Sequence, residues 1–209
     1  MALGGYEIFL LIVGIDVIVG PLLTLVVFNT AKRSLNFDLA VIALLQILAV
    51  AYGVSTMLEA RPAYIASLGD AFHVVQATEV TDENLRKANT TLPWWGPKLV
   101  GTKYEIDKDL QSLVSDLSAI GAGKGHVPQL HVPYESVRDQ VAKDAMSIAD
   151  MKTRTDTKSE EIDDWLAAHS RGVASAKYQA IKIGPNYYAI VLDAKSGSMV
   201  GITSFKLNM

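Results

Sequence analysis

Two long apolar runs, over residues 6–28 and 39–57, dominate the pattern of hydrophobic and polar positions along this chain. Each is close to the roughly 20 residues that a helix needs to cross a hydrocarbon core about 30 Å thick. Neither run shows the one-sided apolar stripe of a helix on the surface of a globular protein. The pattern therefore predicts a two-helix transmembrane hairpin over residues 1–59, with spans at about 6–28 and 39–57 and a loop at 29–38.

Two other interpretations of these runs carry less weight. A cleaved signal peptide would need a basic leader, a shorter apolar stretch and a small-residue cleavage site, which the first run lacks. A buried hairpin of a soluble protein would be expected to keep polar residues on one face, and both runs have almost none.

The short loop between the runs predicts the topology, because Lys and Arg beside membrane spans are retained on the cytoplasmic side. The loop carries Lys32 and Arg33, whereas residues 1–5 carry no basic residue, and Arg61 after the second run is a weaker opposing signal. We therefore expect a cytoplasmic loop and, in a bacterium, a multi-pass inner-membrane protein whose residues 60–209 lie in the periplasm.

Residues 60–209 have the mixed pattern of an α+β domain. Residues 71–77 read as a strand, Thr81 as the cap of a short helix, and residues 90–104 as a loop, because Pro93, Gly96, Pro97 and Gly101 interrupt it. Amphipathic spacing predicts helices over residues 107–120, with one buried face, over 134–151, and over 159–170, with Ser159 as N-cap. The chain then closes with apolar segments at 178–183, 187–192 and 199–206, which predict a C-terminal antiparallel β-meander with helices packed on one face.

Composition excludes several classes of function. The formal net charge is −3 and no cluster of basic residues stands out, so a nucleic-acid partner is not expected. The chain has no cysteine, which removes disulfides and thiolate chemistry, and its four histidines lack the spacing of a metal site. No catalytic or nucleotide-binding motif is present. We therefore expect neither an enzyme nor a bound metal or cofactor.

Candidate functional residues fall in two places. Asp16 lies in the middle of the first apolar run, where an ionisable side chain is costly. We expect it to pair the two spans, with Thr24 and Gln46 as possible partners, or to anchor a partner helix, rather than to relay protons. Trp94 and Trp95 stand between Pro93 and the Gly96-Pro97 pair, and they are candidates for contact with a protein partner or with the bilayer interface. The alternative is that these rings plug the core beneath the loop.

The membrane region also resembles that of the type IV pilin accessory protein family of Gram-negative bacteria. The resemblance is dense over about the first 70 residues and looser afterwards, where it includes a Pro-Trp-Gly-Pro-like loop and the terminal meander. Its distinctive elements are Gly14-Ile15-Asp16, Gly20-Pro21-Leu22-Leu23-Thr24, Phe37-Asp38-Leu39, Gln46, Tyr52-Gly53 and Ala60-Arg61-Pro62.

This resemblance implies an inner-membrane factor that helps a type IV pilin subunit to accumulate or assemble, in the manner of a dedicated chaperone without catalysis. Members of the family usually begin with a further hydrophobic helix, whereas this sequence starts at Met1-Ala2-Leu3-Gly4-Gly5, so we expect either a shortened start or a truncated product. The alternative function is a membrane-tethered periplasmic sensor or small-molecule-binding module. The sequence names neither the pilin that is served nor the oligomeric state.

Overall fold

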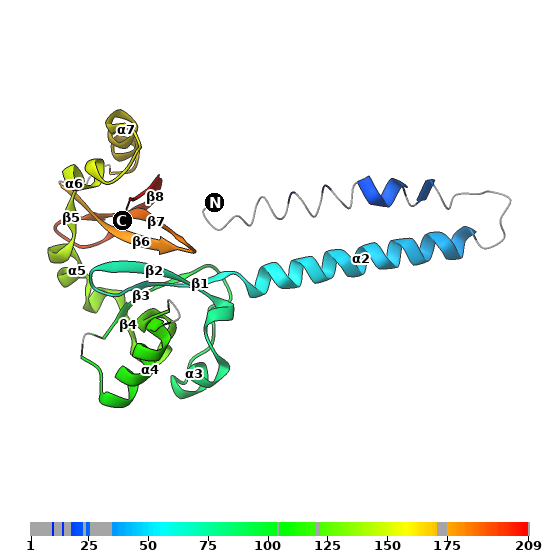
Figure 1. The fold of residues 1–209 in the computed structure, drawn as a ribbon, viewed down its shortest axis with the longest axis horizontal. Coiled ribbons are helices and arrows are strands. Elements are labelled where there is room, and N and C mark those ends of the chain that lie inside the picture. Colours follow the sequence, from blue (N-terminus) through cyan, green and yellow to red (C-terminus); the bar gives the residue numbers. More distant parts are fainter. Residues whose placement is uncertain are drawn as a thin grey trace. The chain divides into compact units, whose positions relative to one another are not determined.

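The computed structural model describes residues 10, 14, 18–22, 24, 25, 35–103, 105–119, 122–170 and 175–208. The chain forms two compact units, Met1–Ala60 and Arg61–Met209. The second apolar run lies within helix α2 (Leu35–Glu59; Figure 1). This helix has no buried residue. Among the described residues, α2 is the one helix long and apolar enough to span a membrane. The predicted two-helix hairpin is not established, because most of the first run lies outside the described residues.

A single mixed sheet forms the centre of the second unit, in the strand order β4-β3-β1-β2-β6-β7-β8, with β5 paired to β6. The described strands are β1 (Pro62–Ser67), β2 (Ala71–Gln76), β3 (Lys98–Thr102), β4 (His131–Pro133), β5 (Met146–Ser147), β6 (Ala176–Ile183), β7 (Asn186–Asp193) and β8 (Met199–Lys206). The C-terminal meander is confirmed, since β6, β7 and β8 are consecutive antiparallel neighbours. The parallel pairs β1–β3 and β2–β6 extend the meander into the larger mixed sheet of this α+β unit.

Short helices connect and cover the strands. They are α3 (Asp82–Lys87), α4 (Lys108–Ala119), α5 (Arg138–Asp144), α6 (Ile148–Thr153) and α7 (Ser159–His169), with 3-10 turns η1 (Ala77–Glu79), η2 (Lys124–His126), η3 (Pro128–Leu130) and η4 (Tyr134–Ser136). Figure 1 shows α3 and α4 beside the β3–β4 end of the sheet, and α6 and α7 beside the other end. The cap predicted at Thr81 is confirmed, because its hydroxyl accepts a hydrogen bond from the Asn84 amide.

Two apolar clusters stabilise the sheet. One lies around β1, β2 and β3, and Leu85 of α3 packs against it. The other joins Met151 of α6 and Ile162 of α7 to Tyr178 and Ala180 of β6. Because side chains alternate along a strand, Gln179 faces the opposite side of β6, where it donates to the Val141 carbonyl of α5. Helices therefore contact both faces of β6, and the prediction of helices on one face is wrong.

The expected loop over residues 90–104 is also wrong in part, because Lys98–Thr102 form strand β3. Gly101, which indicates a loop in the sequence, lies inside this strand. The strand has glycine at this position because a side chain there would overlap Val137 Cγ2. The parallel pairing with β1 and the antiparallel pairing with β4 supply the backbone hydrogen bonds that local sequence does not predict.

The helix predicted over residues 134–151 is interrupted. Ala145 is extended, Met146 and Ser147 pair with β6, and the Ser147 hydroxyl then caps α6 by accepting from the Asp150 amide. The apolar residues keep a helical spacing through this interruption, but Met146 and Ser147 pair with strand β6 instead of continuing the helix.

Two further details differ from expectation. Helix α7 begins at Ser159 itself, so its N-cap is Lys158 rather than Ser159. Helix α4 is amphipathic as predicted, but Leu110, Leu113 and Val114 on its apolar face are half-buried rather than buried.

Candidate functional site

A groove of about 850 Å³ lies beside the β3–β4 end of the sheet. Its walls come from the connection that follows α3, which includes Leu92 and Trp94, and from β3, β4 and the start of η4, which include Lys98, His131 and Tyr134. The lining is mixed, with aliphatic and aromatic side chains beside exposed hydroxyl and charged groups. Such a surface suits a partner that presents both apolar and polar atoms.

His131 lines this groove and is held in place by two contacts. Its ring makes an edge contact with Tyr64, with ring centroids 4.6 Å apart, and its Nε2 lies 2.8 Å from the Gly125 carbonyl oxygen. Burial lowers the pKa of His131 below its ordinary value of 6.5. The ring is therefore neutral at neutral pH, and Nε2 must carry the proton that it donates to Gly125. This histidine positions the groove rather than acting as a charged group.

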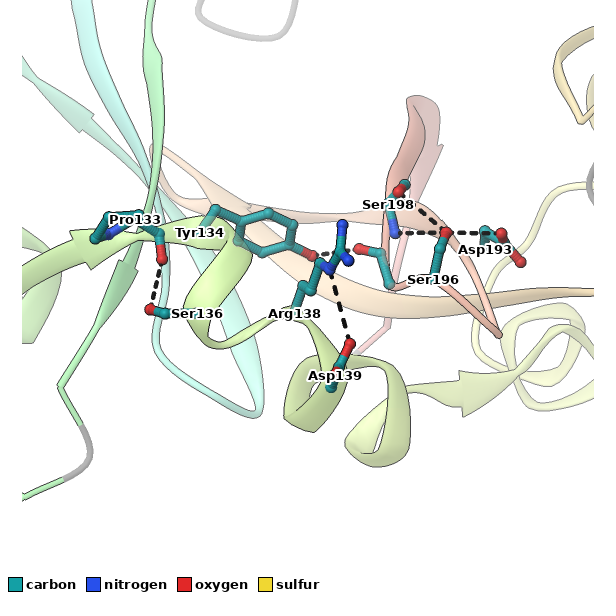
Figure 2. Close-up of polar contacts among 9 residues, drawn as sticks. Pro133, Tyr134, Ser136, Arg138, Asp139, Asp193, Ser196 and Ser198 are labelled. Carbon is teal, nitrogen blue, oxygen red and sulfur yellow. Dashed lines mark hydrogen bonds and ion pairs between the residues drawn. The ribbon is translucent and has the colours of Figure 1, made fainter.

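Tyr134 anchors the wall at the start of η4. The tyrosine is buried, and its hydroxyl donates to the Gly197 carbonyl at 2.7 Å (Figure 2). Gly197 lies in the β7–β8 turn, which the Asp193 carboxylate organises by accepting from the Ser196 hydroxyl at 2.7 Å. That bond also lowers the pKa of Asp193. The groove is thus tied to a turn 63 residues further along the chain.

Trp94 lines the groove and Trp95 follows it in the chain, and their side chains are 79% and 88% exposed. The alternative in which they plug the core is therefore wrong. The turn that presents them has Gly96 at φ +57°, a left-handed conformation that glycine adopts without strain. Arg61 holds its first residue, since the guanidinium Nη2 donates to the Pro93 carbonyl at 3.3 Å.

The structure also brings together Glu79 and His126, which sequence reasoning missed because 47 positions separate them. His126 is buried, its Nδ1 accepts from the Gly123 amide at 3.0 Å, and its Nε2 lies 3.6 Å from Glu79 Oε2. Hydrogen bonding to His126 lowers the pKa of Glu79. The pair fastens η2 to η1, and within the described part of the chain no three ligand-type side chains gather around a possible metal position.

The membrane candidates are only partly within the described residues. Asp16, Lys32 and Arg33 lie outside them. Gln46 of α2 packs against Gly20 of the first apolar run, where a side chain larger than hydrogen would overlap its amide. Thr24 donates to the Gly20 carbonyl at 2.9 Å, and Gly20, Thr24 and Gln46 line the same shallow hollow. The structure therefore gathers two of the three residues that we expected to associate helices.

Comparison with known proteins identifies relatives that are each described as a fimbrial assembly protein. The chain is 25% identical over 164 residues to a fimbrial assembly protein of Dichelobacter nodosus serogroup E1, covering 76% of this chain and 64% of the relative. It is 26% identical to the serogroup I protein over the same shares of both chains. It is 32% identical over 88 residues to the protein of serogroups C1 and C2, covering 41% of this chain and 67% of that relative.

The chain thus spans about 64% of the length of the first two relatives. Their aligned 164 residues outnumber those in either compact unit, so the similarity extends over parts of both. No family model matches the chain, and no solved structure matches it.

Proposed function

Because the chain belongs to the family of fimbrial assembly proteins, we propose that it is an inner-membrane accessory protein that supports the stability or assembly of a type IV pilin. It acts as a dedicated chaperone and catalyses no reaction. The observation that carries this proposal is the similarity to fimbrial assembly proteins across parts of both the apolar N-terminal unit and the sheet domain.

In this proposal both apolar runs cross the inner membrane, the loop with Lys32 and Arg33 is cytoplasmic, and residues 60–209 are periplasmic. The apolar, unburied helix α2 supports the second span. Reporter fusions after Met209 test the arrangement: a reporter active only in the periplasm should work, and a reporter active only in the cytoplasm should be silent. The reverse result would refute this topology.

The groove beside β3 and β4 is the proposed contact for the pilin. A pilin waiting in the membrane presents a long apolar helix and a periplasmic head, so a helper needs both a membrane segment and a domain. The groove provides the contact for the periplasmic head, because its mixed lining suits a folded protein surface. The apolar helix of the pilin would be held within the bilayer by polar contacts from Asp16, Thr24 and Gln46.

Pilin abundance in a deletion strain tests the function. We expect pilin to be depleted without the protein and restored by the wild-type chain. Lys98→Glu reverses an exposed charge in the groove and should restore pilin poorly, whereas Lys206→Glu makes the same change at an exposed position on β8 and should restore it fully. Unchanged pilin in the deletion strain would refute the proposal and favour the membrane-tethered sensor, for which the groove would be a small-molecule pocket.

A further inference from the structure

We propose that Trp94 and Trp95 insert into the headgroup region of the bilayer that holds α2, and so anchor the sheet domain against the membrane. This assigns lipid, rather than pilin, to the aromatic pair. The proposal rests on the membrane insertion of α2 in the proposed function, but it requires no pilin.

Chain connectivity places the turn near the membrane. Helix α2 ends at Glu59, and Arg61 follows two residues later, so extended chain separates them by no more than about 7 Å. Pro62 disfavours helical backbone at Arg61, which ends the helix before the domain begins. The Arg61 guanidinium then donates to the Pro93 carbonyl, directly before Trp94. Covalent links and one hydrogen bond therefore tie the aromatic turn to the residue where the chain leaves the membrane helix.

The exposure of the pair indicates an environment other than water. Trp94 and Trp95 are the most exposed large hydrophobic side chains among the described residues. Tryptophan is enriched at membrane interfaces, because its ring enters the apolar region while its N–H reaches a polar partner.

The turn is also built to hold the rings outward. Pro93 and Pro97 restrict the backbone on either side, and Gly96 allows the left-handed bend between them. The backbone of the turn therefore loses less conformational freedom when the two rings enter the bilayer interface. The remaining tryptophan, Trp165, contrasts with the pair, since it is half-buried and stacks on His169 with ring centroids 4.2 Å apart.

A lipid partner explains the link to Arg61, whereas a pilin contact gives no reason for the pair to be fixed to the end of a membrane span. Trp94 also lines the groove. Anchoring the turn would therefore hold the groove close to the bilayer, where a membrane-held subunit leaves the hydrocarbon.

Tryptophan fluorescence tests this on the full chain in vesicles, because the chain has three tryptophans and none lies in the apolar runs. Trp165→Phe leaves only the pair as emitter, and Trp94→Phe with Trp95→Phe leaves only Trp165 as a matched control. Vesicles are made from phosphatidylcholine and phosphatidylglycerol, with or without bromine on acyl carbons near the glycerol. We expect brominated lipid to remove about half of the emission of the pair, since interfacial indoles lie at that depth, and to leave Trp165 unchanged.

Equal emission of the pair in brominated and ordinary vesicles, with the protein floating with both, would overturn the proposal. A blue shift of the pair only after purified pilin is added, without quenching by bromine, would overturn it in favour of a pilin contact. Failure of the chain to float with vesicles would refute the membrane placement on which both proposals rest. Unchanged pilin in a deletion strain would refute the proposed function but leave quenching by lipid as expected.

Discussion

Substituting Gly101 tests whether tertiary packing alone places strand β3. Gly101 is buried, and its backbone lies outside the left-handed region, so alanine can adopt the conformation. Its new methyl group would nevertheless overlap Val137 Cγ2 and approach Val137 Cγ1 at 3.1 Å and Val132 Cγ2 at 3.2 Å. Overpacking of this kind costs about 1–3 kcal/mol. Alanine recovers about 0.4–1 kcal/mol by restricting the unfolded chain, so we expect a net loss of about 1–2 kcal/mol.

Substitution of Val137 tests the same contact from the opposite side. Val137 is 8% exposed, and Val137→Ala removes two methyl groups worth about 0.8 kcal/mol each, a loss of about 1.6 kcal/mol. In the double variant, the methyl at position 101 occupies the space that Val137 has left. We therefore expect the double variant to be more stable than the sum of the single changes predicts, by about 1–2 kcal/mol.

Urea unfolding of the full chain in detergent micelles measures these differences, followed by near-UV circular dichroism. That signal reports the packed aromatic residues of the sheet domain, and the unfolding free energy follows from linear extrapolation. Additivity of the two substitutions within about 0.5 kcal/mol would show that residues 101 and 137 do not compete for space, and the packing argument for β3 would be wrong.

Three further outcomes are expected. Tyr134→Phe removes the hydroxyl that donates to Gly197 and should cost about 1–2 kcal/mol, seen as a lower melting temperature; an unchanged melting temperature would contradict the anchoring role. Burial, with Lys182 nearby, lowers the pKa of His73 from 6.5 to about 4, so the unfolded chain takes up this proton first and stability is lost as pH falls from about 6.5 to 4. His73→Gln should flatten the unfolding free energy across that window, and equal slopes would exclude His73 as the cause. In the membrane, Asp16→Asn should restore pilin levels and Asp16→Leu should not, whereas equal loss would indicate a need for the ionised carboxylate.

Local sequence predicted the elements whose cause is local. The second apolar run is a helix because its composition leaves no competing structure. The final strands alternate with turn residues, and the pairing partner of each is its neighbour in the chain. Thr81 predicted the start of α3, because a cap acts within three residues of itself. Exposed tryptophans could be suspected from their proline and glycine neighbours, but not established.

Tertiary structure decided whatever depends on segments that are distant in sequence. Strand β3 exists because β1 and β4 satisfy its backbone, and the break at Ala145–Ser147 exists because β6 pairs there. The same holds for the groove and for the contact between Glu79 and His126. Local preferences of the backbone amount to tenths of a kcal/mol per residue, so a set of sheet hydrogen bonds and a packed core overrule them. The sequence alone thus determined the apolar helix and the order of the closing strands, while packing between distant segments determined where the groove lies and which rings face outward.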